Sequence, residues 1–141
     1  MSSIHAYLTF NGNCREAMMF YQKCVGGELS FQTIEASPLS GKLPAKMKKY
    51  ILHATLKNGS LLLMASDMVS EKGFFRGNAI SLVLNCASEK ETRVCYKNLA
   101  RGGEQTHPLR KTNWNALFGE VTDKYGNHWL LSYSKTAYAV K

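Results

Sequence analysis

The chain has 141 residues, of which 45% are hydrophobic and 20% charged, and its net charge is +8. This length fits one compact unit or two small modules that share a core. No stretch approaches the roughly 20 apolar residues of a membrane helix, and the N-terminus lacks the features of a signal peptide, so we expect no membrane partner. The basic residues neither alternate with aromatics nor form a dense helix face, so we also expect no nucleic-acid partner.

The first half of the chain predicts the element order β-α-β-β-β. Residues 15–25 show helical spacing of apolar side chains after Asn13, a plausible N-cap, and Gly26-Gly27 ends this helix. The pair Asn58-Gly59 separates two strand-like runs and is typical of a tight hairpin. The predicted strands of this half cover residues 4–10, 29–35, 50–56 and 60–65.

The second half predicts the same element order. A helix is predicted over 88–101, with Ser88 as its N-cap and Gly102-Gly103 at its end. Residues 109–113 are basic and polar and are expected to form a loop, and 135–141 are expected to form a frayed or loosely docked tail. The predicted strands of this half cover residues 79–84, 104–108, 116–122 and 128–133.

An internal repeat relates the two halves. Residues 5–28 and 79–104 share an apolar run, an asparagine, a helical stretch and a Gly-Gly-Glu end. One helix cannot bury the sheet face of either half alone, so we predict an α+β protein in which two βαβββ modules lie side by side and form a curved eight-stranded mixed sheet. The predicted boundaries are 1–67 for the first module, 68–78 for a linker and 79–141 for the second module, which together make one compact domain.

The four cysteines show no CxxC spacing; they are Cys14, Cys24, Cys86 and Cys95. Three of them fall in the predicted helical stretches, and one directly precedes such a stretch. This usage predicts free thiols in a reducing compartment, so we expect a cytoplasmic protein.

Motifs spread over nearly the whole chain form a recognisable set: Tyr7-Leu8-Thr9-Phe10-Asn11-Gly12-Asn13, Gly26-Gly27, Leu63-Met64-Ala65-Ser66-Asp67, Leu99-Ala100-Arg101-Gly102-Gly103 and Asp123-Lys124-Tyr125-Gly126. As a set they resemble the vicinal oxygen chelate superfamily of glyoxalases, bleomycin-resistance proteins and extradiol dioxygenases, and most closely its PhnB-like branch. The resemblance implies paired βαβββ modules of the glyoxalase/bleomycin-resistance fold and a homodimer. Members isomerise, cleave rings or only bind drugs, so the fold does not assign a chemistry. One departure is Asn115, where these relatives usually have glycine.

Metal-dependent members of the superfamily carry His, Glu or Gln on the first and last strand of each module. In this chain the matching positions are His5, Ala79, Leu63 and Leu130, and a shift of one residue on the last strands would select Met64 or Leu131 instead. One imidazole among aliphatic side chains does not hold a catalytic divalent ion. We therefore predict no metal and no cofactor.

Strand alternation predicts which side chains line a cleft. If His5 faces the cleft, Tyr7 and Thr9 share its face. A mostly apolar cleft with a few polar side chains is typical of a small-molecule pocket. Trp114 and Phe118 would form a lid or stacking wall, or Trp114 would fill the core. The predicted ligand-binding residues are His5, Tyr7, Thr9, Leu63, Ser81, Trp114, Phe118, His128 and Leu130.

Two hypotheses for function follow. The first is metal-free binding of a small, partly apolar, anionic molecule, which the basic surface would attract. The alternative is a metal-dependent or acid–base lyase or isomerase of the glyoxalase type, acting on a small oxygenated substrate. Its candidate catalytic residues are His5, His53 and Asp67; alternation does not decide which way His53 points, and Asp67 has a turn cap as its competing role.

Overall fold

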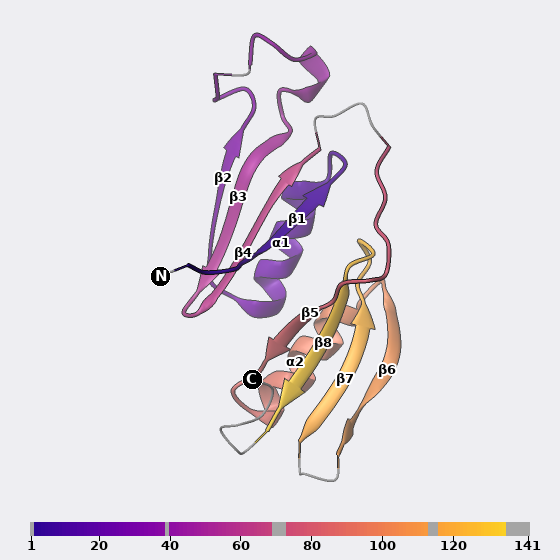
Figure 1. Cartoon of the computed structure of the whole chain (residues 1–141). Coiled ribbons are helices and arrows are strands. Elements are labelled where there is room, and N and C mark those ends of the chain that lie inside the picture. Colours follow the sequence, from indigo (N-terminus) through magenta and orange to yellow (C-terminus); the bar gives the residue numbers. More distant parts are fainter. Residues whose placement is uncertain (1, 39, 69–72, 113–115, 135–141) are drawn as a thin grey trace. The chain divides into compact units, whose positions relative to one another are not determined.

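The computed structural model describes residues 2–38, 40–68, 73–112 and 116–134. The chain divides into two compact units, Met1–Phe75 and Arg76–Lys141, called the first and second unit below. Each unit contains a four-stranded mixed sheet with one helix against one face (Figure 1). The prediction of an α+β protein built from two βαβββ modules is confirmed, and the eight strands are divided between two four-stranded sheets.

In the first unit the strand order is β1-β4-β3-β2. Strand β1 pairs with β4 in parallel, and the other two pairings are antiparallel. Helix α1 packs on β2, β3 and β4. The elements are β1 (Ala6–Phe10), α1 (Cys14–Val25), β2 (Glu28–Thr33), the short 3-10 helix η1 (Ala45–Met47), β3 (Ile51–Asn58) and β4 (Leu61–Asp67).

The second unit repeats this topology with the order β5-β8-β7-β6, and α2 packs on β6, β7 and β8. Strand β6 extends to Lys111, beyond the predicted strand end at 108, because Arg110 and Lys111 pair with Phe118 and Leu117 in the sheet. The elements are β5 (Leu82–Asn85), α2 (Glu89–Ala100), β6 (Glu104–Lys111), β7 (Leu117–Thr122) and β8 (His128–Tyr133).

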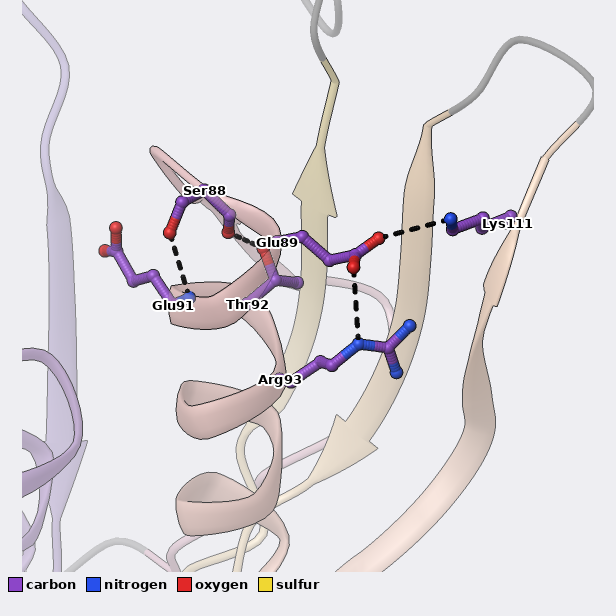
Figure 2. A network of polar contacts seen from close by, with 6 residues as sticks. All are labelled: Ser88, Glu89, Glu91, Thr92, Arg93 and Lys111. Carbon is purple, nitrogen blue, oxygen red and sulfur yellow. Dashed lines mark hydrogen bonds and ion pairs between the residues drawn. The ribbon is translucent and has the colours of Figure 1, made fainter.

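The two helices begin differently. Ser88 is the N-cap of α2 as predicted, and its Oγ accepts a hydrogen bond of 3.0 Å from the Glu91 amide (Figure 2). Asn13 occupies the N-cap position of α1, but its side chain makes no capping hydrogen bond. Asp67 at the end of β4 replaces it, because Asp67 Oδ1 accepts a 2.9 Å hydrogen bond from the Cys14 amide.

The repeated Gly-Gly pairs have a common structural cause. Gly26 and Gly102 end their helices with φ of 75° and 78°, a conformation that favours glycine. A Cβ on Gly27 would overlap the carbonyl oxygen of Lys57 near the end of β3, and one on Gly103 would overlap the carbonyl oxygen of Thr122 at the end of β7. Each second glycine therefore allows the backbone to pass close to the third strand of its own unit.

Each core lies between helix and sheet. The fully buried side chains include Met18, Tyr21 and Leu56 in the first unit, and Leu99 and Leu131 in the second. Burial of such side chains is the main favourable term in folding. Among the described residues, no helix is both long and apolar enough to cross a bilayer.

Candidate functional site

Each sheet has one face that its helix covers and an opposite face, here called the helix-free face. In β1, Tyr7 is 50% exposed while Phe10 is fully buried. In β4, Leu63 and Ala65 are buried between more exposed neighbours. Because strand side chains alternate between faces, Tyr7 and Thr9 lie on the helix-free face of the first unit, with His5 preceding them along the chain.

A row of side chains crosses this helix-free face. Tyr7 pairs with Met64 in β4, which pairs with Thr55 in β3, which in turn pairs with Ser30 in β2. The hydroxyl groups of Ser30 and Thr55 are 2.7 Å apart and hydrogen-bonded. The row therefore combines a phenol, a thioether and two hydroxyls.

His53 completes this surface. It lies two residues before Thr55 on β3, and its ring centroid is 6.1 Å from that of Tyr7, with 33° between the ring planes. The β-bulge at Leu52, where Gln32 pairs with His53 but Thr33 pairs with Ile51, allows Ile51 to be buried without turning His53 away from Tyr7. The sequence left the direction of His53 open, and the structure places it on the helix-free face.

The polar atoms of Tyr7 and His53 are unused within the part of the chain that the structure describes. Among the residues that the structure describes, neither the Tyr7 hydroxyl nor the His53 imidazole makes a hydrogen bond or ion pair. His5 differs, because its Nε2 is 3.0 Å from Ser3 Oγ in an exposed contact. Within the described residues, the phenol of Tyr7 and the imidazole of His53 therefore keep their hydrogen-bonding groups unused, whereas one ring nitrogen of His5 has a partner.

Leu63 lies on the other face. It is 5% exposed and faces α1, and the position beside Tyr7 belongs to Met64. Leu63 was predicted to line the cleft because its position was counted from the hairpin glycine, and this count selects a residue on the wrong face. The β3–β4 turn pairs Asn58 with Leu61, whereas the β7–β8 loop pairs Thr122 with His128, so equal counts do not select equivalent residues. The Asn-Gly turn itself was the signal that could have selected Met64.

Asp67 is part of the framework of the first unit. It is 4% exposed; its Oδ1 accepts hydrogen bonds from the Gly12 and Cys14 amides, and its Oδ2 accepts one of 2.8 Å from the Ile51 amide. These bonds join the end of β4 to the β1–α1 loop and to the start of β3. The side chain lies on the helix-covered face, away from Tyr7, so the structure does not form the predicted couple of Asp67 with a histidine.

The helix-free face of the second unit is built from the equivalent strands, but its histidines have polar partners within the unit. His128 Nδ1 is 2.9 Å from Thr122 Oγ1, and its Nε2 is 3.3 Å from the Gly77 carbonyl oxygen. His107 Nε2 is 3.3 Å from Glu120 Oε2. Every described histidine of this unit therefore has a polar partner.

The remaining predicted contacts of the second unit divide into two groups. Phe118 and Leu130 alternate with buried neighbours and so lie on the helix-free face, and Ser81 is exposed just before β5. Trp114 lies outside the described residues. As ligand contacts, these residues stay predictions.

Two groups on the helix-covered sides of the sheets, the Cys14 thiol and the Tyr96 hydroxyl, have raised pKa values. Burial, followed by the charge of Asp67, raises the pKa of the Cys14 thiol to about 12. Burial also raises the pKa of Tyr96, whose hydroxyl donates a 2.7 Å hydrogen bond to the His107 carbonyl oxygen. Both groups stay protonated at neutral pH and act as packing elements.

The residues do not fit a glyoxalase-type metal centre. Of the four matching positions, His5 is the one with a metal-binding side chain. Among the described residues, no three side chains of histidine, cysteine, aspartate or glutamate are grouped so that they could hold an ion. The described residues therefore do not form the four-ligand set of a glyoxalase-type centre.

Comparison with known proteins agrees with the fold. A protein of *Pseudomonas aeruginosa*, PA1353, has a crystal structure that matches with a TM-score of 0.84 at 38% identity, over 95% of this chain and 98% of that one. Protein YjdN of *Escherichia coli* K12 is 32% identical over 139 residues, which cover 92% of this chain and 93% of YjdN. The structure from *Bacillus cereus* named putative 3-demethylubiquinone-9 3-methyltransferase, PhnB protein, matches with a TM-score of 0.75 at 27% identity, over 94% of this chain and all of that one.

More distant matches share the fold alone. They include glyoxalase-related and glyoxalase/bleomycin-resistance proteins with TM-scores between 0.56 and 0.62 at 12% to 18% identity. The predicted glyoxalase/bleomycin-resistance fold is thereby confirmed. A family model described as 3-demethylubiquinone-9 3-methyltransferase matches residues 2–132, and this chain therefore belongs to that PhnB-like family of the glyoxalase/bleomycin-resistance fold.

Proposed function

We propose that this protein binds a small, planar, oxygenated molecule without the help of a metal ion, and that the ligand lies on Tyr7 and His53. The observation that carries this proposal is the pair of neighbouring rings whose polar atoms have no partner among the described residues. Protein side chains with unused hydrogen-bonding groups beside apolar surface are typical of ligand sites.

The side chains around the ring pair favour a particular ligand chemistry. The two rings offer stacking surface, and Met64 offers a flexible, polarizable contact. A phenol and an imidazole can each donate or accept a hydrogen bond, which suits carbonyl or phenolate oxygens. The net charge of +8 attracts an anion. The relative from *Bacillus cereus* is named for a demethylubiquinone, and a hydroxylated quinone has all of these features.

The assembly and location of the protein are part of the proposal. We infer a cytoplasmic homodimer, which the family resemblance favours. Val83 and Ile80 support an interface at β5: Val83 is 46% exposed on this edge strand of its sheet, and Ile80 is 79% exposed just before the strand begins. Light scattering coupled to gel filtration would measure the mass, and a monomer would contradict this part alone.

The alternative of an acid–base lyase or isomerase has one feature in its favour. His53 stands beside Tyr7, so a substrate seated there would contact two groups that can transfer protons. Asp67 cannot assist, because its two oxygens accept hydrogen bonds from three backbone amides. The enzyme hypothesis therefore depends on His53 with Tyr7 or His5.

The test uses 2-hydroxy-1,4-naphthoquinone, a planar hydroxyquinone that is anionic at neutral pH. Calorimetric titration of the chelator-treated full chain should show saturable binding. We expect Tyr7→Phe and His53→Phe each to weaken binding about tenfold, which corresponds to about 1.4 kcal/mol for one lost hydrogen bond. The matched control is His107→Phe in the second unit, which should leave the affinity unchanged.

Three results would overturn the proposal. Binding that needs added metal, or stoichiometric metal in the native protein, contradicts metal-free binding. Equal affinity of the wild type and His53→Phe for the quinone would show that the ligand does not bind at the Tyr7–His53 ring pair. Turnover of the quinone or of a methylglyoxal–thiol adduct that is lost in His53→Phe selects the enzyme alternative.

A further inference from the structure

A second row of side chains crosses the helix-free face of the first unit, next to the row that contains Tyr7. Thr9 on β1 pairs with Ser66 on β4, and His53 on β3 pairs with Gln32 on β2. Each strand therefore supplies one residue of this row, in the sheet order β1-β4-β3-β2 (Figure 1). The set is called the polar row below, and its members are Thr9, Ser66, His53 and Gln32.

The middle of the polar row follows from the register between β3 and β4. Ala54 pairs with Ala65, so the next residues along the two strands, His53 and Ser66, are neighbours. Both alanines are fully buried on the helix-covered face. Because strand side chains alternate between faces, His53 and Ser66 lie on the helix-free face, and the polar row is continuous across the sheet.

Within the described residues, the side chains of the polar row have unused hydrogen-bonding groups. None of the four makes a side-chain hydrogen bond or an ion pair with another described residue. In the neighbouring row, by contrast, the hydroxyls of Ser30 and Thr55 are 2.7 Å apart and bonded to each other. Hydroxyl, imidazole and carboxamide groups can each donate and accept, so the polar row offers both kinds of contact across the width of the sheet.

The equivalent row of the second unit has a different character. Val83 corresponds to Thr9 in the internal repeat and pairs with Leu130, which pairs with Glu120, which in turn pairs with His107. Two of these side chains are aliphatic, and the other two contact each other, with 3.3 Å between His107 Nε2 and Glu120 Oε2. The fold therefore does not require a polar row at this position, and the first unit has one because of its own residues.

We propose that the ligands of this protein are elongated, multi-ring aromatic molecules with an oxygen at each end, and that Gln32 determines this specificity. The hydroxyls of Thr9 and Ser66 bind one end of the ligand, and the carboxamide of Gln32 binds the other. The rings between the two ends contact Tyr7 and His53. This inference rests on the function proposed above, because it extends the same surface.

The width of the polar row decides the length of the ligand. Neighbouring strands lie about 4.8 Å apart, so the row spans about 14 Å from β1 to β2. A three-ring aromatic molecule has end hydroxyls about 10 Å apart, and a hydrogen bond of about 2.8 Å at each end completes this span. A molecule of one or two rings reaches only one end. Gln32 carries no charge, so it distinguishes ligands by hydrogen bonding.

The test compares two three-ring quinones that differ by one hydroxyl. Calorimetric titration of the full chain measures 2,6-dihydroxyanthraquinone, which has a hydroxyl at each end, against 2-hydroxyanthraquinone, which has one. We expect the wild type to bind the first compound about tenfold more tightly, as one additional hydrogen bond allows. Gln32→Leu keeps the size of the side chain and should bind the two compounds with equal affinity.

The matched control is Gln105→Leu on β6 of the second unit, which should keep the tenfold difference. Equal affinities of the wild type for the two anthraquinones, or a difference that persists in Gln32→Leu, would overturn this inference. If 2-hydroxy-1,4-naphthoquinone still binds and depends on His53 in that case, the proposed function stands without it. Absence of binding for all three quinones would overturn the proposed function and this inference together.

Discussion

The two units share one framework but differ on their helix-free faces. In the first unit, Tyr7 and His53 have no polar partner among the described residues. In the second unit, His128 contacts Thr122 and His107 contacts Glu120. Because the strand order and the Gly-Gly helix ends are the same, the difference lies in the side chains and in local backbone features such as the β-bulge at Leu52. Among the described residues, the duplicated fold therefore leaves the polar groups of Tyr7 and His53 unused on one face, while the histidines of the equivalent face have polar partners.

Buried aspartates distinguish the units in a second way. Asp67 accepts hydrogen bonds from Gly12, Cys14 and Ile51, which belong to other elements. Asp123 accepts them from the Tyr125 and Asn127 amides and from Trp129 Nε1, all within six residues along the chain. The first unit uses its carboxylate to join distant segments, and the second uses its carboxylate to shape one hairpin.

The largest effect should come from removing the carboxylate of Asp67. Asp67→Ala leaves three backbone amides without an acceptor, and we expect it to lower the free energy of unfolding by about 4 kcal/mol. Hydrogen exchange should rise in the β1–α1 loop and at the start of β3. For Asp123→Ala the increase should stay within residues 122–129. A change confined to the neighbourhood of Asp67 would contradict this difference between the units.

Alanine at the second glycine of each pair tests the shared framework. Gly27→Ala and Gly103→Ala place a methyl group against the carbonyl oxygens of Lys57 and Thr122, and each should cost about 2–3 kcal/mol of folding free energy. Urea unfolding measures both variants, with Gly41→Ala as the control, because a Cβ there meets no atom within 4 Å. A large cost in one unit and none in the other would show that the two Gly-Gly ends are not equivalent.

Alkaline pH should affect the units in opposite directions. Cys14 has its pKa raised from 9.0 to about 12, so its stabilising effect is complete below pH 9 and is lost as the pH rises through the folded-state value. The loss amounts to about 1.4 kcal/mol per pH unit within that window. Cys86 has its pKa lowered, so it stabilises the fold above the pKa of the unfolded chain, and this contribution is lost as the pH falls through the folded-state value.

The measurement is the pH dependence of urea unfolding from neutral pH to about pH 10, within the window set by these shifts. Cys14→Ala should flatten the decline in stability at high pH, and Cys86→Ala should make it steeper. Parallel curves for the wild type and Cys14→Ala would show that Cys14 ionises equally in the folded and unfolded chain.

Local patterns predicted most of the fold, and the errors come from long-range contacts and from one hairpin turn whose length was misjudged. The repeat, the Gly-Gly helix ends and the Ser88 cap depend on neighbouring residues and could be read from the sequence. The cap of α1 could not, because its acceptor, Asp67, lies 53 residues beyond Cys14 along the chain. Leu63 was assigned to the wrong face because the two hairpins have different lengths. The direction of His53 depends on a bulge that pairing with β2 creates.

The smallest effect should come from replacing one histidine in each unit by phenylalanine, which keeps a ring and removes its nitrogens. His128→Phe loses its contacts with Thr122 and Gly77 and should cost about 1 kcal/mol of folding free energy. His53→Phe loses no hydrogen bond among the described residues, so its unfolding midpoint should match the wild type. Thermal unfolding of both variants measures the difference. An equal loss of stability at His53 would mean that its imidazole serves the fold, and the first unit would then have no more unused polar groups than the second.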